Sequence, residues 1–335
     1  GVTNSYVYTN NGAGLFFLHT TLLMSRANDV ALGDADGDGD LDAFMANKAA
    51  EVSSLWINDG AGFFTNSGQS LGPNNDSAVA LADLNGDGTL DAFYATAMNQ
   101  CRVYTNNGRG RMSATGQAFL SINATGAALG DMNGDGRIDA VVSASTGNSR
   151  VLTNNGAGFF YDTGWLGTNN ANDAALGDVN GDGALDACFA VNGADAVFTN
   201  NGYGALSFVQ SLGPADNSMS VNLGDIDGDR DLDIFTAVVS GSSRLYWNAS
   251  PNLAAVGAGQ NIITNEAAAE TALGTDFGDL SLGHGATNLF AITNWGQVDL
   301  IISGVITNGT GAPAFQIRGA PARISPNTAS NFAIV

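Results

Sequence analysis

Acidic and amide side chains recur with one spacing in five short segments of the chain. The segments are 34–42, 83–91, 131–139, 178–186 and 225–233, and each reads Asp-x-[Asp/Asn]-Gly-Asp-[Gly/Arg]-x-x-Asp. Because the oxygens at positions 1, 3 and 5 alternate along a tight turn, we expect them to converge on one side of it. Position 7 can add its backbone carbonyl, and the aspartate at position 9 closes the set. Hard oxygen donors with several carboxylates favour Ca²⁺ over Zn²⁺, so the segments predict calcium loops.

Each loop contributes five predicted metal ligands. They are Asp34, Asp36, Asp38, Asp40 and Asp42; Asp83, Asn85, Asp87, Thr89 and Asp91; Asp131, Asn133, Asp135, Arg137 and Asp139; Asp178, Asn180, Asp182, Ala184 and Asp186; and Asp225, Asp227, Asp229, Asp231 and Asp233. A metal-free Asp/Asn-Gly turn is the alternative for a single copy, but five copies in register favour the metal. The fifth loop has Arg230 where the others have glycine. A non-glycine residue at positive φ costs about 1–2 kcal/mol, so we expect this site to be the weakest.

The loops recur every 47–49 residues, and a second motif runs in register with them. Tyr8-Thr-Asn-Asn-Gly-Ala-Gly14 recurs in related form at 56–62, 104–110, 152–158 and 198–204, with a truncated copy at 246–248. Asn-Gly or Asp-Gly between apolar stretches indicates a β-hairpin, because both residues tolerate positive φ. Each repeat therefore predicts four short strands. No window carries a sustained helical period, so we expect helix to be nearly absent.

Four-stranded antiparallel units repeated at this period indicate an all-β protein with a β-propeller. Five Asp loops predict five blades, each with one calcium loop, over residues 1–250. A linear β-solenoid is the alternative, although its rungs are normally shorter than this unit. The chain starts with the sequence of strands three and four, and the fifth repeat supplies strands one to three. We therefore expect the two ends to share one blade and close a ring.

The five loops at this spacing resemble FG-GAP/VCBS-type repeats, the calcium-loop propellers of integrin α-chains and of many secreted bacterial proteins. The resemblance covers about residues 1–250. It implies the propeller fold and bound calcium. It does not imply one biochemical function, because such propellers serve adhesion, sugar binding and scaffolding alike.

The composition changes beyond residue 250, where the Asp loops stop. Alternating apolar runs predict strands at 261–264, 279–282, 287–293, 299–306, 314–318 and 331–335. Six or seven strands in this length suggest an immunoglobulin-like β-sandwich over residues 251–335. The stretches 274–278, 289–296 and 300–304 resemble the choice-of-anchor D domain of bacterial surface proteins.

The charge balance limits the classes of partner. The chain carries 32 acidic residues against 11 lysines and arginines, and its formal net charge is −21. Phosphate binding needs a basic surface, so nucleic acid is excluded as a partner. The apolar runs are too short to cross a bilayer, so we expect no transmembrane segment. Gly1 stands in place of an initiating methionine, which predicts a mature extracellular chain whose signal peptide has been removed.

Candidate catalytic residues are few, and we expect no enzymatic activity. His19 falls in a predicted strand and His284 in a glycine-flanked turn, so packing or surface roles are favoured for both. Cys101 and Cys188 fall on strands of non-adjacent blades, which predicts buried thiols rather than a disulfide. Fivefold repetition of the Asp clusters indicates a structural metal rather than a catalytic carboxylate pair.

These features predict a secreted, calcium-stabilised structural or adhesive surface protein. The alternative is a carbohydrate-binding lectin that uses clefts between blades, with Trp56, Tyr104, Tyr203 or Trp247 stacking on sugar rings. The partner is a surface protein, a glycan or a second copy of the chain. The strand-like segments 5–8 and 331–335 favour self-association by strand addition, which would produce a filament or sheath.

Overall fold

The computed structural model of the chain describes residues 4–22, 26–48, 51–72, 75–97, 100–168, 170–228, 231–239, 241–248, 253–256, 262–263, 288–294, 300–301, 317–318, 321–325 and 328–334. Every regular element in these ranges is a β-strand, as the sequence predicts. Among the same residues, no helix is long and apolar enough to cross a membrane. Contacts divide the chain into two units, residues 1–223 with 234–246 and residues 224–233 with 247–335.

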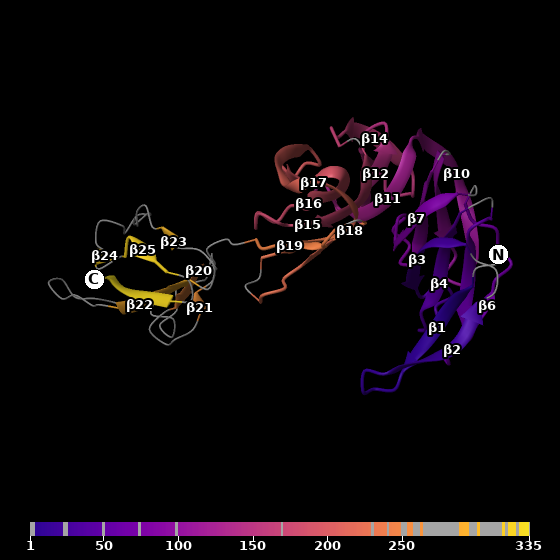
Figure 1. The fold of residues 1–335 in the computed structure, drawn as a ribbon, viewed down its shortest axis with the longest axis horizontal. Helices are drawn as coiled ribbons and strands as arrows, with labels where there is room; N and C mark the ends of the chain where they lie inside the picture. Colours follow the sequence, from indigo (N-terminus) through magenta and orange to yellow (C-terminus); the bar gives the residue numbers. More distant parts are fainter. Residues whose placement is uncertain are drawn as a thin grey trace. The chain divides into compact units, whose positions relative to one another are not determined.

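The first three repeats each fold into a four-stranded antiparallel sheet, here called a blade, in which the strands pair in chain order (Figure 1). Blade one comprises β3 (Ala27–Gly33), β4 (Asp42–Asn47), β5 (Ser54–Asn58) and β6 (Phe64–Asn66). Blade two comprises β7 (Asp76–Ala82), β8 (Asp91–Thr96), β9 (Gln100–Asn106) and β10 (Met112–Ser121). Blade three comprises β11 (Asn123–Gly130), β12 (Asp139–Thr146), β13 (Arg150–Asn154) and β14 (Phe160–Trp165). The Asp loop joins the first and second strands of each blade.

The last two repeats share one five-stranded sheet. Its strands are β15 (Ala171–Gly177), β16 (Asp186–Asn200), β17 (Leu206–Gly224), β18 (Asp233–Val238) and β19 (Arg244–Tyr246). The long β16 replaces the second and third strands of the fourth repeat: it pairs with β15 up to Val191 and with β17 from Asn192. Gly193, at φ 147°, lies where β16 changes partner.

The first hairpin occupies a different place from the one that the sequence predicts. Its strands β1 (Ser5–Asn10) and β2 (Phe16–Leu22) form a separate two-stranded sheet and do not join β18 and β19 in one blade (Figure 1). Val7 and Leu22 pack with Trp56 and other apolar side chains of blade one, whereas β18 pairs with its neighbours in the last sheet. These separate contacts keep the two segments in different sheets.

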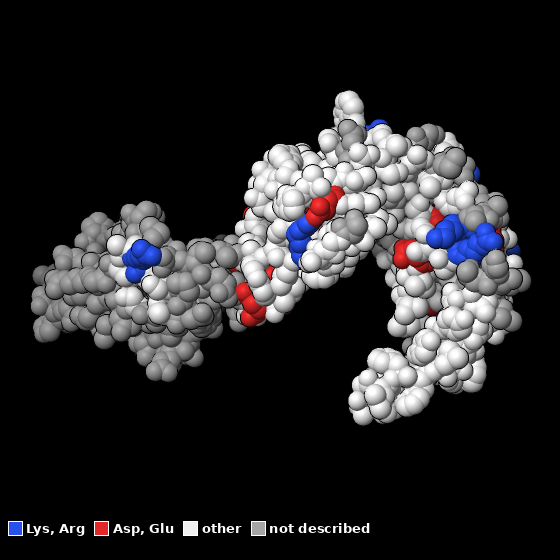
Figure 2. Space-filling view, in the orientation of Figure 1, with Lys and Arg blue, Asp and Glu red and all other residues white. Residues whose placement is uncertain are grey.

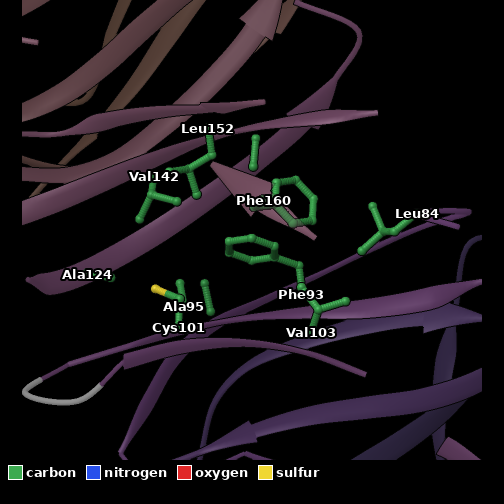
Figure 3. Close-up of a cluster of buried hydrophobic side chains, with 11 residues drawn as sticks. Leu84, Phe93, Ala95, Cys101, Val103, Ala124, Val142, Leu152 and Phe160 are labelled. Carbon is green, nitrogen blue, oxygen red and sulfur yellow. The ribbon is translucent and has the colours of Figure 1, made fainter. Parts of the chain in front are cut away.

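The core lies between successive blades. Figure 3 shows the cluster between blades two and three, in which Phe93 and Phe160 lie close together. The ring of Phe93 lies edge-on to Phe160 and also to Phe119, with ring centroids 5.3 and 5.6 Å apart. Similar clusters lie between blades one and two and between blade three and the fourth repeat. Cys101 and Cys188 are buried in separate clusters as free thiols, which confirms the predicted absence of a bond between them.

The first strands of successive repeats pack against one another, β3 on β7, β7 on β11 and β11 on β15. Small residues at their ends make this approach possible. A Cβ on Gly33 would lie 2.7 Å from the Leu90 side chain, and one on Gly130 would lie 2.5 Å from Leu185. Polar side chains add bonds between the strands: Asp29 accepts the Val79 N–H at 3.0 Å, and Asp173 accepts the Val221 N–H at 3.1 Å.

The C-terminal unit also contains antiparallel strands. They are β20 (Leu253–Val256), β21 (Ile262–Ile263), β22 (Asn288–Asn294), β23 (Leu300–Ile301), β24 (Ile317–Arg318), β25 (Arg323–Ile324) and β26 (Thr328–Ile334). One sheet has the order β21-β20-β22-β26-β24, and β23 pairs with β25. The predicted strand at 279–282 and His284 lie outside the described residues. The immunoglobulin-like sandwich stays a prediction.

Replacing Phe160 tests the core between blades. The Phe160 side chain is 2% exposed and contacts two other phenyl rings, so Phe160→Ala should lower the free energy of unfolding by about 3–5 kcal/mol. The adjacent Phe159 is 37% exposed, and Phe159→Ala is the matched control, with an expected loss of about 1 kcal/mol or less. Urea denaturation measures both. Equal losses would show that Phe160 does not lie in a packed core.

Candidate metal centre

The first aspartate of each loop organises the backbone around itself. In the first loop, Asp34 accepts the N–H groups of Gly37 at 2.7 Å and Gly39 at 3.0 Å. Asp83, Asp131 and Asp178 accept the corresponding pairs in the next three loops. Gly39 has φ 94°, and its counterparts in loops two to four lie between 81° and 88°. Glycine at position 6 therefore makes the turn that the sequence predicts, because positive φ is strained for other residues.

The last aspartate of each loop is buried and joins the loop to the following hairpin. Asp42 is fully buried, and its two oxygens accept the Ala35 N–H at 2.9 Å and the Asn58 N–H at 2.8 Å. The same pair of bonds recurs at Asp91, Asp139, Asp186 and Asp233, whose donors are Leu84 and Asn106, Met132 and Asn154, Val179 and Asn200, and Ile226 and Asn248. A carboxylate oxygen has two acceptor sites, so each oxygen keeps capacity for another partner.

Positions 1, 3 and 9 converge where all three are aspartates. Oxygens of Asp34, Asp36 and Asp42 lie within 4.8 Å of one another, and so do those of Asp225, Asp227 and Asp233. Loops two to four have asparagine at position 3, so a carbonyl oxygen replaces one carboxylate there. Such a set of oxygen donors suits a hard cation such as Ca²⁺.

The aspartate at position 5 accepts the backbone N–H of position 7, and its own N–H donates to position 3. Asp38 accepts the Asp40 N–H at 2.9 Å, and Asp182 accepts the Ala184 N–H at the same distance. In the second loop, Asp87 also accepts the Thr89 hydroxyl at 2.6 Å. In the third loop, the Arg137 guanidinium lies 3.3 Å from the Asp135 carboxylate. Asp229 and Arg230 of the fifth loop lie outside the described residues.

A buried asparagine in the hairpins of the second, third and fourth repeats connects each of them to the preceding repeat, a role that the sequence did not predict. The Asn106 amide of blade two donates to the Ala35 carbonyl in the loop of blade one at 2.8 Å. Asn154 donates to Leu84 at 2.8 Å, and Asn200 donates to Met132 at 2.7 Å. The motif suggests only a hairpin turn. Its strict register with the Asp loops is the signal that could have suggested a joint role.

A glycine in the same hairpin strengthens this connection. The Gly110 N–H donates to the Ala35 carbonyl at 2.8 Å, and the Gly158 N–H donates to the Leu84 carbonyl at 3.0 Å. Gly110 has φ 69°, and a Cβ there would lie 3.3 Å from the Cβ of Asp36. Glycine is therefore needed both for the backbone conformation and for close approach to the neighbouring loop.

Comparison with known protein families identifies the repeat. A family model described as an FG-GAP-like repeat matches residues 34–94, 83–142, 131–189 and 178–236, which together exceed half of the chain. The chain belongs to the FG-GAP-like repeat family. The match confirms the predicted resemblance for these residues. No curated protein matches the sequence significantly.

Solved structures resemble this FG-GAP-like chain to differing degrees. A lectin from Agrocybe aegerita that recognises non-reducing terminal N-acetylglucosamine is 26% identical, with 64% of this chain and 61% of the lectin covered and a TM-score of 0.40. The Vibrio cholerae biofilm matrix protein Bap1 is 21% identical, with 68% of this chain and 40% of Bap1 covered and a TM-score of 0.41. These scores are too low to support an argument about this chain. A functionally unknown protein from Desulfotomaculum acetoxidans is 17% identical over 72% of this chain and 78% of its own, and its TM-score of 0.51 indicates a shared fold alone.

The aromatic residues considered for sugar stacking differ in exposure. Trp56 is buried in the FG-GAP-like blade one and is 8% exposed, so it is not available for stacking. Tyr104 is partly buried, and its hydroxyl accepts the Gly72 N–H at 2.9 Å. Tyr203 and Trp247 are 83% and 53% exposed. Trp165, which sequence analysis did not single out, is 74% exposed.

Burial raises the pKa of the position-9 carboxyls of loops two to four. The pKa of Asp91 rises to about 6, chiefly because the group is desolvated, while the N–H groups of Asn106 and Leu84 partly oppose the rise. Desolvation likewise raises the pKa of Asp139 and Asp186. Without a cation, the ionised form of these groups is therefore disfavoured in the folded state.

Removing the connecting asparagine should weaken the contact between blades two and three. Asn154→Ala removes one hydrogen-bond donor from the buried Leu84 carbonyl and one from the partly buried Ile138 carbonyl. We therefore expect a loss of about 1–3 kcal/mol in the free energy of unfolding. Asn155→Ala is the control, because Asn155 is exposed and caps only its own turn. Denaturant titration measures both, and a larger loss for Asn155→Ala would contradict the connecting role.

The metal-free protein should become more stable as the pH falls from 7 to 5. In the folded protein the pKa of Asp91 is about 6, against 3.8 for an ordinary aspartate carboxyl, so the folded state binds this proton more tightly than the unfolded state. This contribution to stability is therefore present at low pH and is lost as the pH rises through 6. Asp76 and Asp173 act in the same direction, because burial raises their pKa values too. Urea midpoints measured in chelator test this, and a midpoint that rises with pH would contradict it.

Proposed function

We propose that the chain is a calcium-stabilised, non-enzymatic structural or adhesive protein that acts outside the cell. The observation that carries the proposal is the repeated carboxylate at position 9, represented by Asp42. It accepts hydrogen bonds from two backbone N–H groups, and an aspartate occupies the same position in every loop. A cation held by such a group would fix the loop on its hairpin.

The charge distribution supports a role for calcium in stability. The formal net charge is −21, and each loop gathers at least three aspartates. Figure 2 shows a largely uncharged face with acidic and basic side chains in a few patches. Cations in the loops would remove repulsion between these carboxylates. Extracellular calcium modules bind at about 10⁻⁴ to 10⁻³ M, so a calcium-rich exterior is the environment that fits the proposal.

The exposed apolar side chains of the first hairpin support an adhesive or self-associating role. Phe16, Phe17, Leu18, Tyr6 and Tyr8 of β1 and β2 are each between 54% and 64% exposed. Adjacent exposed apolar residues of this kind typically mark interaction surfaces. A second copy of the chain is the partner that we propose for this surface.

The repeat itself supplies the pairing mode. The β1 segment Tyr8-Thr-Asn-Asn-Gly matches the third-strand segment of blade two, Tyr104-Thr-Asn-Asn-Gly. In blade two, Tyr104 pairs with Ala92 of the second strand. The second strands of the described sheets are already paired on both sides, so an edge strand of another copy is the one that would pair with this third-strand sequence in β1. Strand addition of this type joins copies into a filament or sheath.

Calcium should raise the melting temperature, and one loop should account for part of the effect. We expect calcium titration to stabilise the protein by several kcal/mol at saturation and chelator to reverse this. Asp131→Ala removes the residue that organises the third loop, and it should lower the number of bound calcium ions by one, as measured by calorimetry.

Asp59→Asn is the matched control for that substitution. It also removes one negative charge, but it lies in a hairpin position where other copies have Asn11, Asn107, Asn155 and Asn201. Its calcium stoichiometry should equal that of the wild type. If chelator leaves the melting curve of the wild-type protein unchanged, the proposal that calcium stabilises the fold is refuted.

Polar substitutions in the hairpin should reduce self-association. The double variant Phe16→Ser, Leu18→Ser removes two exposed apolar side chains from alternating positions of β2. We expect it to lower the mass of assemblies measured by light scattering in calcium. Val209→Ser changes an exposed apolar residue on β17 and should leave the mass unchanged. A monomeric wild-type protein at high concentration would refute self-association.

A further inference from the structure

A surface groove lies between blade three and the hairpin that follows β16. Its volume is about 340 Å³, and it is lined by Val151, Thr153 and Trp165 on one side and by Tyr203 and Leu206 on the other. Small-molecule sites typically occupy about 300–1,000 Å³, so the groove is large enough for one or two sugar rings. The calcium loops are not part of this lining.

Two exposed aromatic rings border the groove, although the repeat does not require them. Tyr203 is 83% exposed and Trp165 is 74% exposed. The position of Tyr203 is occupied in the other complete hairpins by Ala13, Ala61, Arg109 and Ala157. Because those hairpins form with smaller or charged residues, the turn itself does not need an aromatic ring. The ring adds apolar surface that faces water, which folding alone does not favour.

The walls of the groove are held in place by the contacts that connect the blades. The Asn200 amide donates to the Met132 carbonyl at 2.7 Å, which fixes the second wall against blade three. The Tyr203 N–H donates to the Asn201 side chain at 3.0 Å. In the first wall, Trp165 pairs with Arg150 across the β13–β14 ladder. A groove held in this way loses little freedom when a ligand binds.

We propose that this groove binds a neutral carbohydrate through Trp165 and Tyr203. A pyranose ring presents C–H groups on one face, which match the apolar face of an aromatic ring, and hydroxyl groups at its edge. None of the lining residues is charged, so the groove offers no ion pair to an acidic or basic ligand. The Thr163 hydroxyl, also in the lining, donates to the Val151 carbonyl at 3.1 Å, so its oxygen retains acceptor capacity for a sugar hydroxyl.

The size of the groove favours a sugar over a peptide. A peptide that adds to a sheet edge needs several consecutive strand residues and alternate side-chain pockets. The groove instead concentrates two rings around about 340 Å³. This inference names a partner for the adhesive role proposed above and rests on that role. It does not depend on self-association or on the occupancy of a particular calcium loop.

The test uses the full chain in calcium, after its melting curve has shown that it is folded. An array of neutral oligosaccharides is screened first, and the methyl glycosides of the positive sugars are then titrated by calorimetry. Trp165→Ala and Tyr203→Ala should each weaken binding by about tenfold or more, because each removes one stacking face. Tyr161→Ala is the matched control: Tyr161 is 58% exposed on the same strand, β14, and is not part of the groove lining.

Three results would overturn the inference. They are the absence of binding to any neutral glycan on the array, glycan binding that survives both Trp165→Ala and Tyr203→Ala, and binding of extended peptides in place of glycans. The melting curves in calcium and chelator are recorded on the same samples. A calcium-stabilised protein without glycan binding would refute the groove but not the calcium proposal, whereas groove binding without a calcium effect would refute the latter.

Discussion

The buried carboxylate at the end of each Asp loop is the interaction on which the repeat depends. In the first repeat, Asp42 bonds to the backbone of its own loop and to the Asn58 N–H, which begins the Asn-Asp-Gly turn of the hairpin, so one side chain fixes both turns. A buried carboxylate is costly unless its oxygens find donors. The position-9 aspartates of the other four loops accept the same pair of backbone bonds. Each Asp loop is therefore held against its hairpin in the same way.

The hairpin asparagine carries this relation from one blade to the next. In blade two, the Asn106 N–H donates to Asp91 of its own loop, while its side chain donates to Ala35 of blade one. Successive blades are thus joined both by this network of hydrogen bonds and by the apolar clusters between them. Buried polar networks of this kind contribute to specificity, because a shifted register would leave several carbonyls without donors. Blade spacing is therefore set by hydrogen bonds as well as by packing.

Features that depart from the repeat are the ones that provide candidate binding surfaces. The hairpin β1–β2 exposes Phe16 and Phe17, and the groove beside blade three exposes Trp165 and Tyr203. The corresponding positions of the third and fourth repeats instead bury their side chains, as Leu152 and Phe198 do. The scaffold therefore supplies rigidity, and single non-repeated residues supply exposed apolar surface. The same carboxylates that hold the turns also accumulate negative charge, which is the basis of the proposed stabilisation by calcium.

The sequence alone determined the local structure, because its information lies within single repeats. The alternation of Asp34, Asp36 and Asp38, the glycine after them and the Asn-Gly turn depend on short-range backbone chemistry, and the family, the strands and the loops follow from them. Only the tertiary structure decided relations between repeats. It separated the first hairpin from the last sheet, merged two strands into β16 and brought Asn106 to Ala35, 71 residues away. It also placed Trp165 and Tyr203 in the lining of one groove, which no spacing in the chain predicts. These contacts depend on how the blades pack on one another. Because the sequence pattern is the same in every repeat, it does not determine which strand edge pairs with which.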